Sequence, residues 1–304
     1  MKVILDTDIG TDVDDCLALT VLLGSPEVDL VGITCVHADV ALRAQLVGRL
    51  LRLANRTEIP VATGGAEPLT EGLSAYWEGH EGQGIIEDVD DVVPPIDEAA
   101  ADFIVRTVME QPSEVWLLPI GPLTNIALAL QKEPRLFDHI AGITIMAGSF
   151  RANSNFGLPY VEHNLRCDPV AAALVLEHPV VKTLVPLDVT TRVVIRQDDV
   201  SRMNQVNSPF LNAVADQVAR YPRFMREGFT FLHDPLAAGL LVQPDLMPLT
   251  DLHLDVETGG NYSAGATLGR LPSPDYPVNA RVALDVEPEG AREQLILRML
   301  AAGS

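Results

Sequence analysis

Short apolar runs alternate with helical patterns along the first two thirds of this 304-residue chain. Runs rich in β-branched residues predict strands over Lys2–Leu5, Leu30–Val36, Ile59–Ala62, Val115–Pro119, Ile140–Met146 and Val181–Leu187. Helical spacing between them predicts helices over Asp15–Leu23, Ala41–Ala54, Ile96–Glu110, Leu123–Gln131 and Pro169–Leu176. Nearly continuous apolar strands that alternate with helices are typical of a parallel sheet. We therefore expect an α/β fold with an open, mostly parallel, Rossmann-like sheet and helices on both faces.

The remaining segments are less regular. Residues 64–95 and 147–166 are rich in polar residues and glycine and are expected to be long loops. Further helices, a β-rich stretch at Asp251–Asp285 and a final helix over Pro288–Ala302 are expected in the last third. No repeat or linker divides the chain, and 47% of its residues are hydrophobic, enough for a sizeable core. We expect a single domain spanning residues 1–304.

Five aspartates stand close together directly after the first predicted strand. They are Asp6, Asp8, Asp12, Asp14 and Asp15. Carboxylates packed this closely repel one another and resist ionisation unless a cation neutralises them. A strand–loop–helix order places them at the carboxyl end of a strand, where open α/β sheets bind ligands. Because hard divalent cations prefer several oxygen ligands, the loop predicts a metal site.

Three other interpretations of the acidic loop compete with this one. The first is a solvated acidic turn, the usual fate of a charge run. An EF-hand is excluded, because its sixth and twelfth positions, counted from Asp6, hold Thr11 and Leu17. A phosphatase of the DxD type would use Asp6 and Asp8, but the chain has only three lysines with which to help bind phosphate.

The overall charge restricts the partners. There are 42 acidic against 21 basic residues, a formal net charge of −21, which repels nucleic acid and anionic lipid. The three cysteines, Cys16, Cys35 and Cys167, argue against a disulfide framework and favour a reducing compartment. No leader pattern follows Met1, and no apolar run reaches the roughly 18 residues of a membrane span. We expect a cytoplasmic protein without nucleic-acid or membrane partners.

Four further segments combine polar residues that could act in a site. Each also fits an ordinary structural role: a flexible loop, a strand-to-helix turn, a polar loop, and a helix whose first turn Asp234 caps. In chain order the segments are Gly79–Gly84, Leu118–Ile126, Val161–Asn164 and Phe231–Ala237.

Together with the acidic loop, these segments resemble the inosine–uridine-preferring nucleoside hydrolase family. The resemblance runs from the opening Val3-Ile4-Leu5 strand to Val256–Thr267, nearly the whole chain. The acidic loop and the His-Asp-Pro-Leu-Ala segment are its most specific parts. Members of the family cleave the N-glycosidic bond of ribonucleosides with water, release base and ribose, and hold one Ca²⁺. The resemblance therefore implies a calcium-dependent ribonucleoside hydrolase.

The resemblance also implies roles for individual residues. The Ca²⁺ ligands would be Asp8, Asp15, Asp234 and the main-chain carbonyl of Ile120. Asp8 would serve as the general base for a Ca²⁺-activated water. His233 would serve as the general acid that protonates the leaving base.

A second set of residues would contact the nucleoside. Asp14 would bind the ribose diol, Glu162 and Asn164 its hydroxyls, Met146 the region near O5′, and His80 the base or the 5′ side. The full expected set is Asp14, Asp39, His80, Met146, Glu162, His163, Asn164 and Tyr221.

This chain departs from the family pattern at three places. Asp12 belongs to a two-residue extension of the acidic loop, so either Asp12 or Asp14 could meet the ribose. Asp39 replaces the family's usual asparagine, and His163 replaces a frequent aromatic residue. Tyr221 is open to two interpretations, a mobile contact to the base or a half-buried helical tyrosine.

Two rival functions remain. A catalytically silent nucleoside- or ribose-binding protein would keep the same pocket, and a DxD-type phosphatase is a more distant alternative. The retained His233 and Asp8 favour the enzyme, because binding alone needs no acid–base pair. A histidine acid suggests tolerance of pyrimidines, the base preference stays open, and a homodimer or homotetramer is expected from the family.

Overall fold

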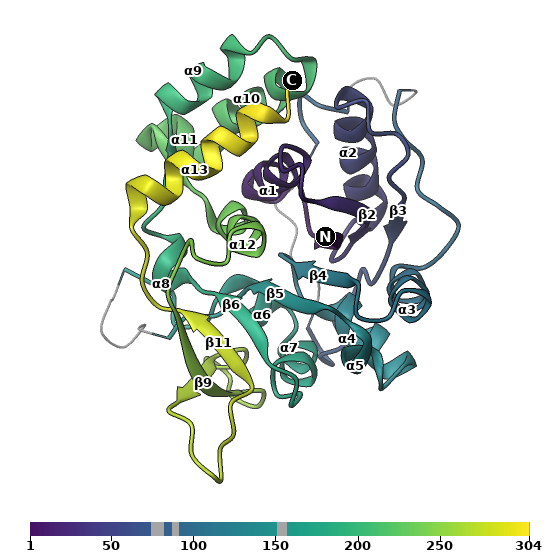
Figure 1. The fold of residues 1–304 in the computed structure, drawn as a ribbon, viewed down its shortest axis with the longest axis vertical. Helices are drawn as coiled ribbons and strands as arrows, with labels where there is room; N and C mark the ends of the chain where they lie inside the picture. The colour runs from purple at the N-terminus through teal and green to yellow at the C-terminus, as the bar shows by residue number, and fades with distance from the viewer. Residues whose placement is uncertain (74–81, 87–90, 151–156, 304) are drawn as a thin grey trace.

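The computed structural model describes residues 1–73, 82–86, 91–150 and 157–303. Within these residues, nine strands form one central sheet in the order β10-β9-β11-β6-β5-β4-β1-β2-β3 (Figure 1). The seven strands from β11 to β3 are parallel, whereas β9 and β10 are antiparallel. The strands are β1 Lys2–Thr7, β2 Asp29–Cys35, β3 Val61–Thr63, β4 Val115–Pro119, β5 Gly142–Met146, β6 Lys182–Val185, β9 Leu249–Val256, β10 Thr267–Arg270 and β11 Ala280–Ala283. The mostly parallel sheet confirms the expected fold class.

Helices cover both faces of this sheet (Figure 1). One face carries α1 Asp14–Leu23, α2 Val40–Leu53, α12 His233–Val242 and α13 Pro288–Ala301. The other carries α3 Ala100–Glu110, α4 Thr124–Lys132, α5 Leu136–His139 and α7 Pro169–Leu176. Strand β1 serves both cores, because its alternating side chains place Val3 and Leu5 in one apolar cluster and Ile4 in the other.

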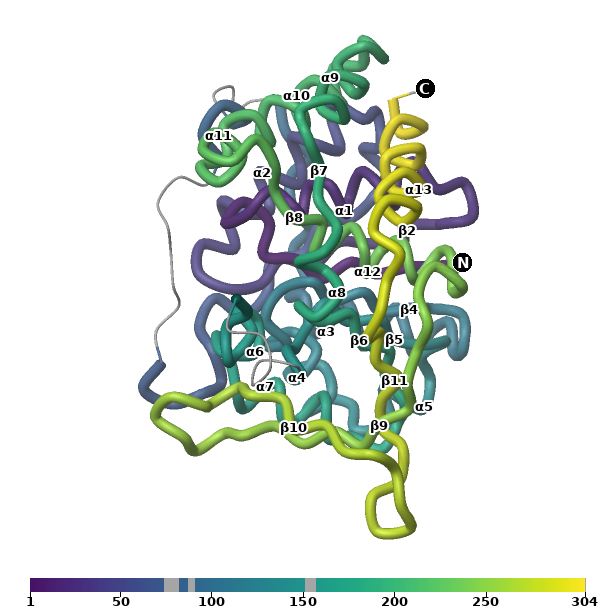
Figure 2. The backbone as a smooth tube through the Cα atoms, turned by 90° about the vertical axis from the view of Figure 1, so that its left-hand side faces the viewer, coloured from purple at the N-terminus to yellow at the C-terminus, as the bar shows by residue number. Residues whose placement is uncertain are grey.

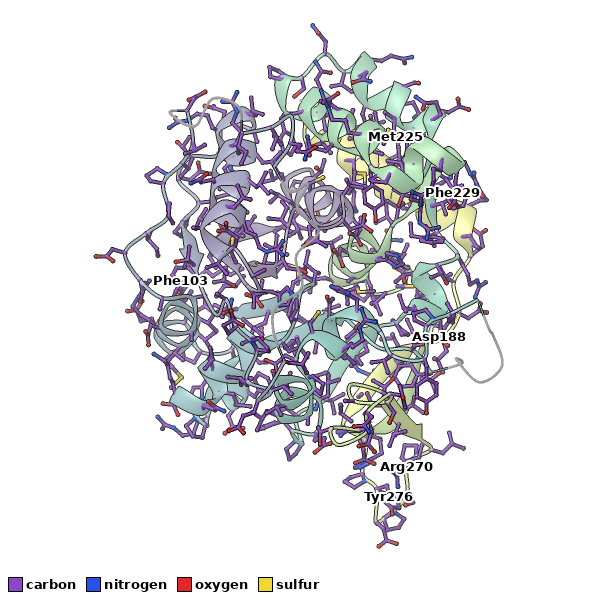
Figure 3. The ribbon with its side chains drawn as sticks, turned by 180° about the vertical axis from the view of Figure 1, so that it is seen from behind. Phe103, Asp188, Met225, Phe229, Arg270 and Tyr276 are labelled. Carbon is purple, nitrogen blue, oxygen red and sulfur yellow. The ribbon has the colours of Figure 1, made fainter. Side chains whose placement is uncertain are left out.

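A smaller unit stands beside the sheet. It contains α9 Gln197–Gln205, α10 Pro209–Arg220, α11 Pro222–Glu227 and the two-stranded pair β7 Val194–Arg196 with β8 Phe229–Phe231. At the opposite end of the molecule, the antiparallel strands project outward, and Arg270 stacks over the Tyr276 ring at 4.3 Å near their tip (Figure 3).

Several predicted boundaries were wrong for local reasons. The third helix begins at Ala100 rather than Ile96, because the Ile96 amide donates to the Val61 carbonyl of β3. Strand β6 ends at Val185, before Pro186, and α8 Leu187–Thr190 follows. The expected loop over 147–166 contains the start of α6 His163–Cys167. Among the helices of the described ranges, none combines the length and apolar character that crossing a membrane requires.

The carboxyl ends of β5, β4, β1 and β2 lie next to one another. Segments from far along the chain reach this edge, including α6 and α11, which lie at different heights of the molecule in Figure 2. The topology therefore brings the acidic loop after β1 close to groups from distant parts of the chain.

Candidate active site

The acidic loop joins the end of β1 to α1. Helix α1 begins at Asp14, and no side chain caps its first turn, so Asp14 and Asp15 occupy the turn whose amides lack helical partners. Both side chains are buried. A helix N-terminus favours negative charge, which explains how α1 tolerates two adjacent buried carboxylates.

Three buried carboxylates converge at this point. Ligand atoms of Asp14, Asp15 and Asp234 all lie within 4.8 Å of one another. Asp234 comes from the first turn of α12, which packs against α1. Burial raises the pKa of each carboxyl well above its usual range, and the charges of neighbouring aspartates, Asp8 among them, raise it further. An all-oxygen set with this much repulsion fits a hard divalent cation.

Asp8 lines the same cavity but is not one of these three residues. Its carboxylate lies against Gly121, where an added Cβ would stand 2.7 Å from Asp8 Oδ1. Only glycine leaves room for Asp8 there. The preceding residue, Ile120, also lines the cavity, and its carbonyl accepts a 2.7 Å hydrogen bond from Asn164 Nδ2.

Asp6 has a structural role. Its Oδ1 accepts hydrogen bonds from Thr34 Oγ1 at 2.5 Å and Asn125 Nδ2 at 2.7 Å. Burial raises its pKa to about 7. Asn125 also accepts from the Gly65 amide at 2.8 Å, so the Gly-Pro-Leu-Thr-Asn segment ties β1 to the loop after β3.

Hydrogen bonds hold the residues of α6 that line the cavity in place. Glu162 is buried and caps α6, accepting from the amides of Asn164 and Leu165 at 2.7 and 3.2 Å. Burial raises its pKa. Asn164 Nδ2 also donates to the Met146 carbonyl at 3.3 Å. These contacts connect α6 to the ends of β4 and β5 and fix the polar groups facing the cavity.

His163 is half-buried beside this network. Its Nε2 lies 3.5 Å from Cys167 Sγ, one helical turn away. Burial raises the pKa of the Cys167 thiol to about 12, so this cysteine stays protonated.

His233, the first residue of α12, also lines the cavity. Its Nδ1 lies 2.7 Å from Thr190 Oγ1 of α8, and its ring stands 5.2 Å from that of Phe231. Burial lowers its pKa to about 4, and the positive charge of Arg223 contributes. The imidazole is therefore neutral at neutral pH in the free protein.

Tyr221 lies at the junction of α10 and α11. Its hydroxyl donates a 2.6 Å hydrogen bond to Asp12 Oδ2. Asp12 Oδ1 accepts from the Val13 amide at 2.6 Å. The additional aspartate of the acidic loop thus has a partner, and Tyr221 is more than a half-buried helical residue.

Most of the predicted site residues line one cavity of about 830 Å³. The predicted residues that line it are Asp8, Asp14, Asp15, Ile120, Met146, Glu162, His163, Asn164, Tyr221, His233 and Asp234. Asp39 does not line it: this residue is exposed, and its Oδ1 caps α2 by accepting from the Leu42 amide at 3.0 Å. His80 lies outside the described residues. The cap interpretation of Asp234 was wrong, because α12 has no side-chain cap and Leu232 precedes it.

Sequence reasoning missed Arg43. This fully buried arginine of α2 donates from Nε to the His37 carbonyl at 2.7 Å, from Nη1 to the Ile9 carbonyl at 2.8 Å and also to that of Asp8. Nη2 lies 3.1 Å from Thr11 Oγ1. Its position on the apolar face of α2, in register with Leu50, was the signal that could have revealed it.

Three more arginines that sequence reasoning missed line the cavity, on α6 and α11. They are Arg166, Arg223 and Arg226. Single surface arginines in short helices carry no sequence signal of a site, so only the structure reveals them.

A parallel α/β sheet with a buried carboxylate cluster at its carboxyl edge defines the class: an α/β protein whose ligand site lies at that edge. Comparison with known proteins gives the family. The inosine-uridine preferring nucleoside hydrolase family matches residues 3–293. The pyrimidine-specific ribonucleoside hydrolase RihA of Photobacterium profundum is 32% identical over 308 residues, covering 98% of each chain. RihA of Escherichia coli is 31% identical over 315 residues, with the same coverage.

Solved structures agree with the sequence comparison. A plant nucleoside hydrolase, PpNRh1, superimposes with a TM-score of 0.86 at 27% identity, covering 98% of each chain. A purine-preferring ribonucleoside hydrolase from Gardnerella vaginalis has a TM-score of 0.84 at 26% identity, covering 100% of this chain and 99% of its own. The chain belongs to the inosine–uridine preferring nucleoside hydrolase family and is an enzyme that hydrolyses the N-glycosidic bond of ribonucleosides.

Proposed function

We propose that this hydrolase works with Ca²⁺ held by Asp8, Asp15, Asp234 and the Ile120 carbonyl, with Asp14 close enough to share the cation or the ribose diol. The observation that carries this proposal is the buried group Asp14, Asp15 and Asp234, whose ligand atoms lie within 4.8 Å of one another. A divalent cation bound there supplies Lewis acidity, which lowers the pKa of water. The all-oxygen donors support Ca²⁺ over a softer metal.

The residues around the cluster act on the attacking water and on the ribose. Asp8 takes the proton of the attacking water, a role supported by its place in the cavity beside the cluster. Glu162 and Asn164 hold the ribose hydroxyls, and their hydrogen bonds to backbone groups keep them oriented without substrate. Holding the ribose favours a flattened, oxocarbenium-like transition state.

His233 serves the leaving base. A neutral imidazole cannot protonate it, so the pKa of His233 must rise when negative charge develops beside it. The hydrogen bond between Nδ1 and Thr190 supports this role, because it fixes the ring against the cavity.

The favoured substrates are pyrimidine ribonucleosides. The curated relatives at 31–32% identity are named pyrimidine-specific, whereas the Gardnerella enzyme at 26% identity is named purine-preferring. His233, at the end of the cavity where the nucleobase is expected (the base end), supports pyrimidine substrates as well. The enzyme would then serve the salvage of nucleobases.

The test is an assay of ribose release. The purified protein is incubated with uridine, cytidine and inosine, with Ca²⁺ or with a chelator, and reducing sugar and free base are measured. We expect release with uridine and cytidine that depends on Ca²⁺. Release of no ribose from any of the three would refute the proposal, and tight ribose binding without turnover would identify a binding protein instead.

Three organisational features complete the proposal. The chain acts as one domain over residues 1–304, supported by a family match that runs through residues 3–293. It works in the cytoplasm, supported by three buried cysteines that are all free. It forms a homodimer or homotetramer, as expected from the resemblance alone, and light scattering of the purified protein tests this.

A further inference from the structure

The base end of the cavity contains a stack of three side chains from three elements. The Arg223 guanidinium of α11 lies 4.6 Å from the centroid of the Phe231 ring on β8. The Phe231 ring lies 5.2 Å from the ring of His233, the first residue of α12. All three line the cavity. The stack places a permanent positive charge one aromatic ring away from the expected general acid.

The charge of Arg223 is only weakly neutralised by other protein groups. Its ion pair with Glu227 Oε2, one turn later, spans 3.4 Å, and the two side chains are 36% and 40% exposed. A contact this long between exposed groups contributes little energy. The contact with the Phe231 ring holds the guanidinium at 4.6 Å, and Nη1 alone donates to Glu227, at 3.4 Å.

The field of Arg223 reaches the groups around the expected nucleobase. Burial raises the pKa of Asp12 and of the Tyr221 hydroxyl and lowers that of His233, and the charge of Arg223 acts to lower all three. In a chain with a net charge of −21, Arg223 is the arginine of this cavity that stacks on the aromatic ring next to His233.

We propose that Arg223 is a further catalytic residue, whose guanidinium contacts the leaving nucleobase and stabilises the negative charge that develops on it. The inference rests on the proposed nucleoside hydrolysis. As the bond between C1′ and the base nitrogen breaks, its electron pair goes to the base. The water oxygen bonds to C1′, the proton of that water goes to Asp8, and the base anion takes a proton from His233 or from solvent. Arg223 keeps its own proton throughout.

A planar cation suits this task better than a second acid. Pyrimidine and purine anions delocalise charge onto ring nitrogens and carbonyl oxygens, which a guanidinium can meet with two parallel N–H groups. A donor that is already oriented toward the developing charge needs little reorganisation during the reaction. Loss of one such donor typically lowers kcat by about 10² to 10³.

Leaving-group dependence separates this role from packing. We would compare Arg223→Gln and Arg223→Lys with the wild-type enzyme on uridine and on 4-nitrophenyl β-D-ribofuranoside. Nitrophenolate is a stable anion that needs no help in leaving. We expect Arg223→Gln to lower kcat on uridine by about a hundredfold and to leave kcat on the nitrophenyl riboside near the wild-type value. Arg223→Lys, which keeps the charge, should recover part of the loss on uridine.

The matched control is Arg220→Gln. Arg220 ends the neighbouring helix α10, is exposed, pairs with Asp216 at 2.6 Å and does not line this cavity. We expect this variant to treat both substrates as the wild type does. Thermal melting of each variant verifies folding.

Other outcomes overturn the assignment. An equal loss of kcat on both substrates would show that Arg223 only shapes the cavity. Unchanged kcat on both would show that Arg223 takes no part in the reaction. A wild-type enzyme that is inactive on both substrates would refute the proposed function itself, and this inference with it. If the wild type is active and Arg223→Gln changes kcat equally on both substrates, only the role of Arg223 is refuted and the proposed function stands.

Discussion

The two ends of the cavity are built differently. The cluster end is formed by strand ends and the first turns of α1 and α12, and its Asp14, Asp15 and Asp234 are buried. The base end is formed by α11, β8 and His233 at the start of α12; α11 and β8 are short elements outside the central sheet, and Arg223 there is 36% exposed. This difference suggests that the sheet fixes the ribose chemistry, while a separate unit sets which base can leave.

Loss of a cluster carboxylate should give the largest effect. Asp15→Asn removes a proposed ligand while keeping the shape of the side chain. We expect kcat to fall on the order of a thousandfold or more, because the Lewis acidity at the cluster is lost. Ca²⁺ binding, measured by calorimetry, should weaken in parallel.

The control for that variant is Asp39→Asn, which changes an exposed carboxylate that caps α2 outside the cavity. It should bind Ca²⁺ and turn over uridine like the wild type. The metal-free Asp15→Asn protein should melt no lower than the wild type, because the substitution removes a buried carboxyl whose ionised form is opposed by desolvation and by the neighbouring Asp8. An Asp15→Asn enzyme with normal Ca²⁺ affinity would break the contrast between the two ends.

The pH dependence of Ca²⁺ binding is the next effect. Burial and mutual repulsion raise the pKa of Asp14, Asp15 and Asp234 well above the usual range. Protons therefore compete with the cation until the pH exceeds these raised values. We expect the apparent Ca²⁺ affinity to increase with rising pH, by up to about tenfold per pH unit for each proton displaced.

Calorimetry in buffers of different ionisation enthalpy measures the protons released. Release should decrease as the pH rises, because fewer of these carboxyls then carry a proton before the cation binds. Affinity that does not change between weakly acidic and alkaline pH would mean that the carboxylates are already ionised in the free protein.

A third prediction concerns the support of the cluster end. Arg43→Met leaves the carbonyls of His37, Asp8 and Ile9 without the hydrogen bonds that the guanidinium donates. Removing a buried charged partner of several polar groups costs about 3 kcal/mol or more. Chemical denaturation should detect this loss of unfolding free energy.

The Arg43→Met variant should also bind Ca²⁺ more weakly, because the backbone that positions Asp8 is released. The same measurements on Arg52→Met, an exposed arginine of the same helix, provide the control. Destabilisation of the fold with unchanged Ca²⁺ affinity would limit Arg43 to a structural role.

The different origins of the two ends also explain what the sequence could predict. The strand and helix pattern predicted the sheet, and motif order predicted most of the cavity lining around Asp8, Asp15 and Asp234. These groups follow strand ends or begin helices, so topology alone brings them together. Asp39 was misplaced because its role depends on the capping geometry of α2. Arg43 and Arg223 were missed because their roles arise from contacts with distant segments, which no local pattern encodes.

The smallest predicted effect tests the junction of the two ends. Tyr221→Phe removes the hydroxyl that donates to Asp12 and leaves the ring in place. Net loss of one such hydrogen bond costs about 1 kcal/mol, which corresponds to a severalfold change in an equilibrium constant. Because Asp12 lies in the extension of the acidic loop whereas Tyr221 lies at the start of α11, KM for uridine should rise severalfold while Ca²⁺ affinity and ribose inhibition stay unchanged. If Ca²⁺ affinity falls together with KM, the two ends are coupled through Asp12, and their separation into a metal unit and a base unit is wrong.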